Sequence, residues 1–485
     1  MFILLIMVTV LLPQAAGSQQ SRIQPDVLQL AANEPGTRLA VIVQMQHDTA
    51  YVATTIVRLG GVVTRDLSII HAVAATLPTR AVLALAQTAG VRWISLDAPV
   101  HSTGMPPCTA CVDTSTVQTT FIPSINADQV WNTAPHYQGQ GVGVAVVDSG
   151  ITPGADFTTN GVSRIVANVG IPSASATTDD LWGHGTHVAG IIAGNGAHSH
   201  GAYMGVAPQA NLINVKVGDD LGNVRESDIV SGLQWINDNK TAYNIRVVNL
   251  SVNAAVAQSY NTSPLDAAVE ILWFNKIVVV VAAGNFGRNA LYPPANDPFV
   301  ISVGAADDMG TQKQIDDRIA SFSAYGKTQD GFFKPELVAP GVNIISTMHK
   351  TDAIAIQHPA NVISADYFSM SGTSMAAPVV SGVVALLLQA EPNLTPDQVK
   401  YRLMATARTI GGYGKGAGEV NAYAAVNKKT TESANTKTQA SQLLWTGRQP
   451  LTWDSTSWNS ANWGAANWGA ANWGAANWGS DWWEN

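Results

Sequence analysis

The sequence predicts an α/β fold with a mostly parallel sheet and helices on both faces, preceded by a small α+β domain of ferredoxin-like order. Two patterns support this prediction. Between residues 142 and 304, continuous apolar runs alternate with helical patterns, which is typical of parallel strands covered on both faces. Upstream, residues 39–96 follow the order strand, helix, strand, strand, helix, strand. With 485 residues, 46% of them hydrophobic, the chain can bury more than one core.

Residues 1–17 have the features of a secretory signal peptide. The run Met1–Leu12 is apolar, and Pro13 and the small residues Ala15-Ala16-Gly17 follow it. No Lys or Arg precedes the run, so an uncleaved N-terminal anchor stays an alternative, although the run is short for a membrane span. We therefore expect a secreted, extracellular protein that is cleaved after Gly17.

A small domain is expected over residues 36–100. Residues 18–36 are polar and show no periodic pattern, and a regular pattern begins after Arg38. The expected strands are Leu39–Gln46, Val62–Ile70, Ala72–Leu77 and Val91–Leu96, and the expected helices are Ala50–Leu59 and Arg80–Thr88. Residues 101–126 are rich in Thr, Ser and Pro, and we interpret them as a linker.

The large domain is expected over residues 127–427. Its predicted strands are the apolar runs Val142–Val147, Leu212–Lys216, Val247–Ser251, Ile277–Ala282 and Phe299–Gly304. Helical patterns occupy Glu226–Asn237, Pro264–Phe274 and Met375–Gln389. Three hundred residues are many for one core but within the size of a single α/β domain.

The C-terminal part changes composition. Residues 428–452 are interpreted as a linker, and residues 453–485 form a tail in which Trp recurs every five residues, mostly as A-N-W-G-A. Three interpretations stay open: a tail that docks on the large domain, a cell-wall or carbohydrate attachment element whose indoles stack on sugars, and a small solenoid similar to pentapeptide repeats.

Charge and cysteine content narrow the partners. The formal net charge of −8 argues against nucleic acid, because nucleic-acid-binding domains usually carry a basic stripe. Cys108 and Cys111 lie in the predicted linker, where a local disulfide or two free thiols are expected. A redox pair is disfavoured, because such pairs normally begin a helix of a βαβ unit.

Three short segments place an acid, a base and a nucleophile in one order along the chain. Asp148 lies in V-V-D-S-G after a predicted strand, His184 in G-H-G-T-H, and Ser374 in G-T-S-M-A at the start of a helix. A serine hydroxyl needs an imidazole to take its proton, and the imidazole needs a carboxylate to orient it. Taken alone, Asp148 could be a turn residue and Ser374 a helix cap.

Two further groups could hold an oxyanion. The backbone N–H of Ser374 lies at a helix start, where partial positive charge gathers. Asn285, in V-A-A-G-N-F-G, follows another predicted strand, and its amide could donate a second hydrogen bond, although it could also be a turn residue. His187 is interpreted as a packed neighbour of His184 and not as a zinc ligand, because no H-E-x-x-H pattern is present.

Together, these segments resemble the signatures of the subtilisin-like serine peptidases. D-S-G, G-H-G-T-H-V-A-G and G-T-S-M-A-A-P match almost letter for letter, A-A-G-N matches the oxyanion region, and the likeness covers about residues 127–426. The resemblance implies a subtilisin-like fold and a serine endopeptidase in which Asp148, His184 and Ser374 are catalytic and Asn285 is the oxyanion residue. Substrates would be proteins or peptides, and catalysis would need no cofactor.

The upstream domain is similar to the inhibitory propeptide of these enzymes, which implies an autoprocessed zymogen whose partner is its own propeptide. The alternative is a surface- or carbohydrate-binding protein built on an inactive peptidase scaffold.

The chain also departs from the family pattern. The resemblance assigns substrate binding to Ser251, Val252, Asn253, Ala283 and Gly284, but Asn253-Ala254 stands where the family usually has two glycines. Phe286 follows the oxyanion residue and suggests a preference for apolar or aromatic P1 residues. The loop where many relatives bind calcium has no carboxylate, which leaves Asp156 as the candidate ligand for a structural calcium ion.

Overall fold

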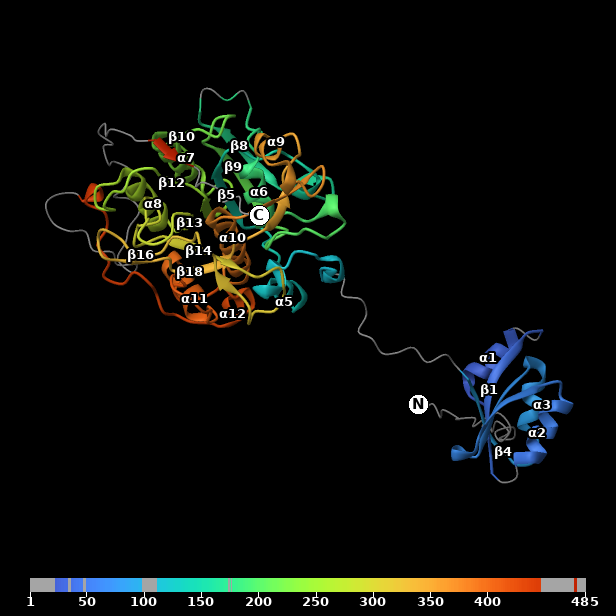
Figure 1. The fold of residues 1–485 in the computed structure, drawn as a ribbon. Coiled ribbons are helices and arrows are strands. Elements are labelled where there is room, and N and C mark those ends of the chain that lie inside the picture. The colour runs from blue at the N-terminus through green and yellow to red at the C-terminus, as the bar shows by residue number, and fades with distance from the viewer. Residues whose placement is uncertain are drawn as a thin grey trace, which may run out of the picture. The chain divides into compact units, whose positions relative to one another are not determined.

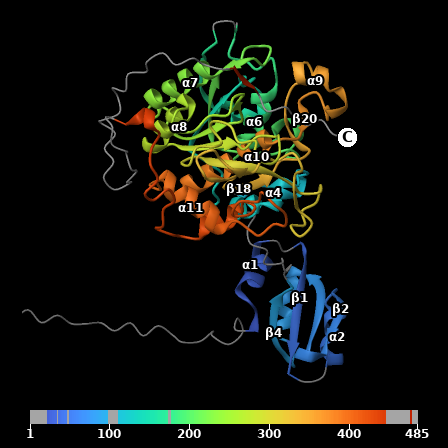
Figure 2. The ribbon, with the colours of Figure 1, turned by 60° about the vertical axis from the view of Figure 1, so that its left-hand side comes forward.

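The computed structural model describes residues 22–33, 36–46, 49–97, 111–172, 175, 177–445 and 475–477. The chain forms two compact units, Met1–Cys108 and Thr109–Asn485 (Figures 1 and 2). The predicted signal peptide and most of the Trp-rich tail lie outside the described residues, and so does Cys108. Cys111 is disulfide-bonded, as one of the two sequence-based alternatives expects.

The first unit has the predicted strand and helix order. Its four-stranded antiparallel sheet has the order β2-β3-β1-β4, in which the two outer positions belong to the second and the last strand. This order is that of ferredoxin-like domains. The elements are β1 (Arg38–Met45), α2 (Thr49–Arg58), β2 (Val62–Leu67), β3 (Ala72–Pro78), α3 (Val82–Ala86) and β4 (Val91–Leu96).

Part of the segment 18–36, which shows no periodic pattern in the sequence, forms regular structure. Helix α1 (Pro25–Asn33) precedes β1, and Ile23 forms a bridge with Ile94 of the last strand. Val27 is the buried side chain of α1. A single buried anchor gives too weak a periodic pattern to be recognised in the sequence, so the packed unit begins earlier than residue 36.

The second unit is built on an eight-stranded sheet. Its order is β15-β14-β13-β11-β5-β9-β8, with β18 beside β14, and every pair except β14 with β15 is parallel. The five predicted strands correspond to β5 (Gly143–Asp148), β9 (Asn211–Lys216), β11 (Ile245–Leu250), β13 (Val278–Ala282) and β14 (Ile301–Asp307). The strands that were not predicted are β8 (Ile165–Gly170), β15 (Arg318–Ile319) and β18 (Leu337–Pro340).

Helices pack on this sheet in two groups (Figure 1). Helix α10 (Thr373–Ala390) contacts the central strands and α6 (His184–Ala193), whereas α7 (Glu226–Asn239) contacts α8 (Pro264–Phe274). Among the described helices, α10 is the one long and apolar enough to cross a membrane, and 89% of its apolar window is buried inside the unit. Shorter helices are α4 (Phe121–Ser124), α5 (Ala127–Asn132), α9 (Ala353–Gln357), α11 (Pro396–Thr406) and α12 (Ala422–Asn427).

Both predicted linkers around this unit are shorter than expected. Within residues 101–126, Phe121 and Ile122 are buried, and within residues 428–452, Ala440 and Leu444 are buried. The backbone N–H of Ser441 also donates a hydrogen bond to the Glu270 carboxylate at 2.8 Å. The packed unit therefore extends beyond residues 127–427 at both ends. The sequence did not predict this, because these segments are mostly polar and only a few apolar side chains anchor them.

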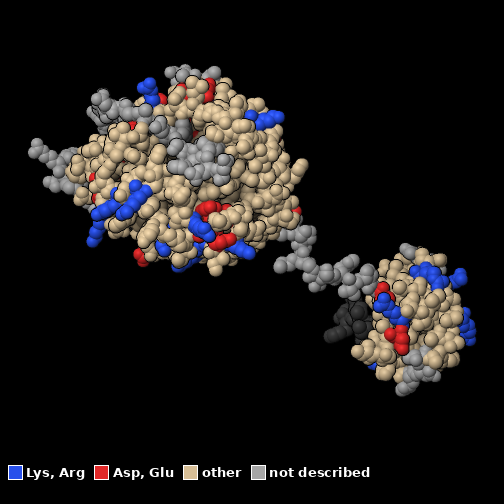
Figure 3. All heavy atoms as spheres, viewed as in Figure 1, with Lys and Arg blue, Asp and Glu red and all other residues tan. Residues whose placement is uncertain are grey.

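Small antiparallel sheets lie around the main sheet. Strands β19 (Ile344–Thr347) and β20 (Tyr367–Met370) form one pair. Strands β10 (Val224–Arg225), β21 (Ala475–Asn477) and β12 (Asn253–Ala254) form another sheet, with β21 in the middle. On the face drawn in Figure 3, charged side chains are sparse and of both signs, as the charged fraction of 12% leads one to expect.

Candidate active site

Asp148 and His184 meet at the carboxyl end of the parallel sheet. Asp148 ends β5, His184 begins α6, and both side chains are fully buried. The Nδ1 atom of His184 lies 2.8 Å from Oδ1 of Asp148. Because an ionised carboxylate only accepts hydrogen bonds, Nδ1 holds the proton in this arrangement, and Nε2 is the basic atom.

The Asp148 carboxylate is oriented by its neighbour Ser149. The backbone N–H of Ser149 donates to Oδ1 of Asp148 at 2.8 Å, and the Ser149 hydroxyl accepts a hydrogen bond from the Gly185 N–H at 3.0 Å. A Cβ atom at position 185 would overlap the Gly150 carbonyl oxygen. Glycine at this position therefore lets the acid and the base approach each other.

Asp180 is a residue of this site that the sequence analysis missed. Its carboxylate is fully buried and accepts hydrogen bonds from the N–H groups of Gly183 and Thr186, at 2.8 and 2.7 Å, and from the Ser149 hydroxyl at 2.8 Å. Burial raises the pKa of Asp180. Asp180 thus satisfies donors of the first turn of α6 and links that turn to the residue beside Asp148. In the sequence, the feature that could have identified Asp180 is an acidic residue shortly before G-H-G.

His187 is a hydrogen-bonded neighbour, as expected. Its Nε2 atom donates to the carbonyl groups of Ile344 and Phe368, at 3.1 and 3.0 Å. Burial lowers the pKa of His187 to about 3, so the ring is neutral at physiological pH. The side chain joins α6 to the β19–β20 pair.

Ser374 is the second residue of α10 and is 1% exposed. Its hydroxyl donates to the Ser251 carbonyl at 3.3 Å, and its own carbonyl accepts a hydrogen bond from the Ser251 hydroxyl at 2.9 Å. Within a helix, the Ser374 carbonyl would be bonded to the N–H four residues later, but that residue is Pro378, which has none. Proline therefore leaves the Ser374 carbonyl available to the end of β11.

A series of buried side-chain hydrogen bonds connects Ser251 to α10. The Ser381 hydroxyl donates to the Asn249 side chain at 2.9 Å, and the Asn249 amide donates to the Ser251 hydroxyl at 3.0 Å. All three side chains are fully buried, and each has a partner. These hydrogen bonds hold Ser251 against α10. They could not be predicted from the sequence, because the β11 segment was interpreted only as an apolar strand.

Asn285 is held by the residue that precedes the candidate nucleophile. Its Oδ1 atom accepts hydrogen bonds from the N–H and the hydroxyl of Thr373, at 2.9 and 2.8 Å. The N–H of Gly284 in turn donates to the Thr373 hydroxyl at 3.1 Å. The fold thus places Asn285 beside the N-terminus of α10, where the backbone N–H of Ser374 also lies.

The candidate substrate-binding edge keeps strand geometry despite its departure from the family pattern. Ser251 and Val252 are fully buried, and Asn253 turns its amide toward β13, donating to the Ala282 carbonyl at 3.0 Å. The Asn253 side chain therefore does not compete for the backbone edge of β12, which pairs with β21. Ala283 is buried, and Gly284 has a positive φ of 105°, which L side chains rarely adopt.

Phe286, expected at the mouth of the P1 pocket, is 58% exposed. Such a large exposed aromatic side chain offers an apolar surface beside the Asn285 backbone.

Asp156, the candidate calcium ligand, accepts hydrogen bonds through both carboxylate oxygens. Its two carboxylate oxygens accept hydrogen bonds from the His198 N–H at 2.8 Å and from the Tyr367 hydroxyl at 2.6 Å. Its backbone carbonyl accepts a hydrogen bond from Arg164 at 2.5 Å, and the residue is 1% exposed. Each carboxylate oxygen thus accepts one hydrogen bond, and the Asp156 side chain and backbone tie three segments together.

Comparisons with known proteins agree with this geometry. A profile described as "Subtilase family" matches residues 139–441. Serine protease AprX of Bacillus subtilis is 41% identical over 282 residues, which are 57% of this chain and 63% of AprX. Subtilisin DY of Bacillus licheniformis is 36% identical over 310 residues, which are 62% of this chain and 97% of Subtilisin DY.

A solved structure is also similar. Fervidolysin of Fervidobacterium pennivorans, described as a keratinolytic enzyme related to subtilisin, aligns with a TM-score of 0.51 and 27% identity, covering 82% of this chain and 62% of fervidolysin. The chain therefore spans somewhat less than two thirds of AprX and of fervidolysin, and nearly all of Subtilisin DY. The strand order, the buried contact between Asp148 and His184 and these matches lead to one conclusion: the chain belongs to the subtilase family of serine peptidases.

Proposed function

We propose that this protein is a secreted serine endopeptidase, made as a zymogen, that hydrolyses peptide bonds through an acyl-enzyme. The buried contact of 2.8 Å between His184 Nδ1 and Asp148 Oδ1 supports this proposal most directly. This contact leaves the imidazole with its basic nitrogen ready to accept a proton, which is the state that a serine nucleophile requires.

The proposed reaction proceeds in two halves. Ser374 Oγ attacks the scissile carbonyl while Nε2 of His184 takes the hydroxyl proton, and Asp148 stabilises the imidazolium that forms. The Ser374 N–H and the Asn285 amide hold the oxyanion. His184 then protonates the leaving amine as the C–N bond breaks. Water attacks the acyl ester by the same steps in reverse and restores Ser374.

Proteins or peptides are the proposed substrates, and catalysis requires no cofactor. The backbone edge of Asn253-Ala254, which pairs with β21 in this structure, can pair in the same way with an extended peptide, and such pairing gives affinity without demanding one sequence. The exposed Phe286 ring favours apolar or aromatic P1 residues. A peptide library cleaved mainly after acidic residues would contradict this preference.

The first compact unit is proposed to be the inhibitory propeptide. It has its own buried core, including Val41, Val43, Leu77 and Ile94, and it forms a unit distinct from the peptidase domain. Such a unit can fold independently and be removed by cleavage in residues 98–126. The apolar start of the sequence supports secretion.

The experiment is expression of the wild-type protein and of Ser374→Ala, with intact-mass analysis and peptidase assay of both. The wild type should lose its N-terminal unit, hydrolyse peptides and be labelled by a fluorophosphonate, which reacts with activated serines. Ser374→Ala should keep the N-terminal unit and show neither activity nor labelling. Peptide hydrolysis by the purified variant would overturn the proposal, and a wild type that is not labelled would favour the binding-protein alternative.

A further inference from the structure

A segment of the Trp-rich tail lies in the middle of a sheet whose outer strands belong to the peptidase domain. Strand β21 (Ala475–Asn477) pairs antiparallel with β10 on one side and with β12 on the other. Ala476 lies opposite Val224 of β10 and opposite Ala254 of β12. Of the three interpretations of the tail, this pairing agrees with docking on the large domain.

The groove between β10 and β12 has room for one extended chain. Two strands that both pair with a third are separated by about 9–10 Å, which is twice the usual spacing of neighbouring strands. Each of these outer strands is two residues long, and in the part of the chain that the structure describes, β12 has β21 as its ladder partner. The groove is therefore a site for strand addition, in which backbone atoms supply the affinity.

The position of β12 relates this groove to the catalytic serine. Asn253, the first residue of β12, follows Ser251 by two positions, and the Ser251 carbonyl accepts a hydrogen bond from the Ser374 hydroxyl at 3.3 Å. From Ser251, strand β12 leads away from Ser374. Because β21 is antiparallel to β12, the chain from Ala475 to Asn477 runs toward Ser374.

This direction is the one that a substrate needs. The residues before a scissile bond lie N-terminal to the carbonyl that is attacked, so they must run toward the nucleophile along the binding edge. The backbone of β21 runs in this direction and occupies the edge that the proposed function assigns to the substrate.

The sequence of the tail offers the same segment three times. Ala-Ala-Asn occurs at residues 465–467, 470–472 and 475–477, each time within W-G-A-A-N-W-G. A tethered segment binds at a high effective concentration, and identical copies on one tether increase that concentration further. The small uncharged alanines also suit a groove that is recognised through its backbone.

We propose that the Trp-rich tail is an intramolecular competitor of peptide substrates, in which Ala475–Asn477 pairs with β10 and β12 in the substrate direction. This proposal rests on the proposed function, since the groove is taken to be the site of substrate binding. An intramolecular competitor raises the apparent KM of a substrate and leaves kcat unchanged, because a saturating substrate displaces the tail. Diluting the enzyme does not relieve the competition.

The test uses the full chain with proline in all three segments: Ala466→Pro, Ala471→Pro and Ala476→Pro together. Proline removes the backbone N–H that a middle strand needs, and changing all three copies prevents one from replacing another. The matched control carries Ser455→Pro, Ser457→Pro and Ser460→Pro, which add three prolines to the tail outside the Ala-Ala-Asn segments. For a short peptide substrate, we expect a KM several-fold lower in the first variant than in the wild type, with equal kcat, and an unchanged KM in the control.

A binding measurement separates this proposal from the proposed function. In the Ser374→Ala background, where the tail cannot be cut by the enzyme, the N-terminal unit is first removed by wild-type enzyme added in trans, and the protein is repurified. The same peptide with a fluorophore should then bind several-fold more tightly when the three segments carry proline. Equal dissociation constants with and without the prolines would overturn the competitor proposal, whatever the activity shows. Absence of turnover in every version that keeps Ser374, together with tighter binding in the proline variant, would overturn the proposed function alone.

Discussion

The N–H and the hydroxyl of Thr373 both donate hydrogen bonds to Oδ1 of Asn285, at 2.9 and 2.8 Å. A backbone N–H can only donate, so the atom that it meets must be the amide oxygen and not the nitrogen. Rotating the amide by half a turn would break both bonds. Thr373 therefore determines which end of Asn285 is left to face a reacting group: the Nδ2 donor.

Replacing Asn285 should weaken catalysis more than binding. In Asn285→Ala we expect kcat to fall about 10²–10³-fold with little change in KM, which is the range known for an oxyanion-hole donor in subtilisin. Asn285→Asp is the matched variant, because it keeps the acceptor for Thr373 and loses the donor. Steady-state kinetics on one peptide measures both, and a normal kcat in either variant would contradict the oxyanion role.

Asp148→Asn should reverse the tautomer of His184. The amide would present an N–H group to Nδ1, the imidazole proton would move to Nε2, and the base would be lost while the geometry stays nearly the same. We expect kcat at neutral pH to fall about 10⁴-fold. A fall of less than about tenfold, measured on protein that is shown to be folded by circular dichroism, would argue against the assignment of Asp148.

Asp352 makes the stability of the peptidase domain depend on pH. Burial and the nearby charge of Asp180 raise the pKa of Asp352 from 3.8 to about 7 in the folded protein. The folded state thus favours the protonated acid, and this contribution to stability is complete below the unfolded pKa and is lost as pH rises through about 7. Asp352→Asn, made in the Ser374→Ala background to prevent autolysis, should raise the Tm above pH 7 and not near pH 4.

The exposed Asp238 supplies the control for this measurement, since Asp238→Asn should leave the pH dependence of the Tm unchanged. An Asp352→Asn protein whose Tm follows the parent at every pH would show that Asp352 titrates normally.

Asp156→Ala should destabilise the domain independently of calcium. The variant leaves the buried Tyr367 hydroxyl without its acceptor, and a buried group without a partner costs about 1–3 kcal/mol. The N–H of His198, an exposed residue, also loses its acceptor. We expect the same fall in Tm in EDTA as in calcium, again in the Ser374→Ala background. A fall in Tm seen in calcium but absent in EDTA would support the calcium hypothesis for Asp156.

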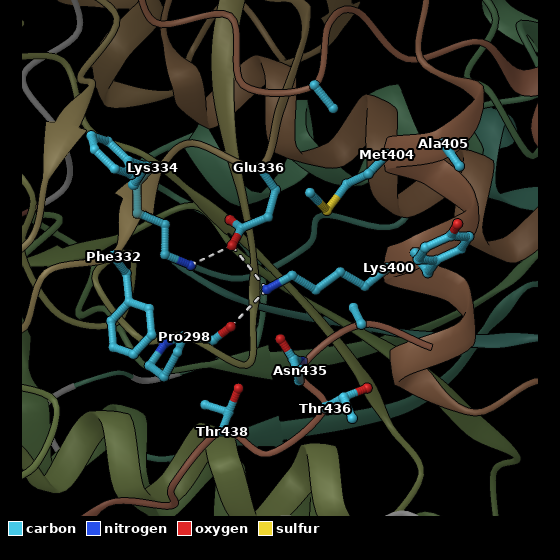
Figure 4. A pocket seen from close by; sticks show the side chains of 14 residues that line it. Pro298, Phe332, Lys334, Glu336, Lys400, Met404, Ala405, Asn435, Thr436 and Thr438 are labelled. Carbon is cyan, nitrogen blue, oxygen red and sulfur yellow. Dashed lines mark hydrogen bonds and ion pairs between the residues drawn. The ribbon is translucent and has the colours of Figure 1, made fainter. Parts of the chain in front are cut away.

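Glu336 neutralises two buried lysines, and its replacement should be strongly destabilising. Figure 4 shows the ammonium groups of Lys334 and Lys400 directed toward the Glu336 carboxylate, at distances of 2.7 and 2.8 Å. Burial lowers the pKa of Lys400 to about 8, so near neutral pH this buried lysine is still mostly charged and needs the negative charge of Glu336. Glu336→Gln should lower the free energy of unfolding by about 3–5 kcal/mol, as measured by urea denaturation.

Glu391→Gln is the control for this pair of charges. Glu391 is 28% exposed and forms an ion pair with Arg402 at 2.6 Å. Solvent reaches the Glu391 end of this pair, although the Arg402 side chain is 1% exposed, so we expect a smaller loss of stability than in Glu336→Gln. Equal losses of stability in the two variants would contradict the role of burial at Glu336.

The sequence allowed the central strands and the catalytic motifs to be predicted because both signals are local. The apolar runs of β5, β9, β11, β13 and β14 are continuous, since these strands are buried on both faces. Strand β8 could not be recognised, because the exposed Asn168 interrupts its apolar residues, so that no long apolar run remains.

Other features depend on contacts between distant segments and were not predictable. Asp180 lies in a stretch with no periodic pattern, and its role is defined only by the donors of α6 that surround it. The pairing of Ala475–Asn477 with β10 and β12 involves backbone atoms, which every sequence has. Asp156 was a reasonable calcium candidate by residue type, but its donors come from His198 and Tyr367, far away in the sequence.

Pro378 has a consequence for local unfolding. Because it removes the helical partner of the Ser374 carbonyl, the first turn of α10 is closed by the Ser251 hydroxyl, which belongs to another segment. That turn cannot fray alone, as helix ends usually do, without also releasing the end of β11. We therefore expect the amides around Ser251 and Ser374 to exchange with deuterium as one cooperative unit, so that the nucleophile and the binding edge open and close together.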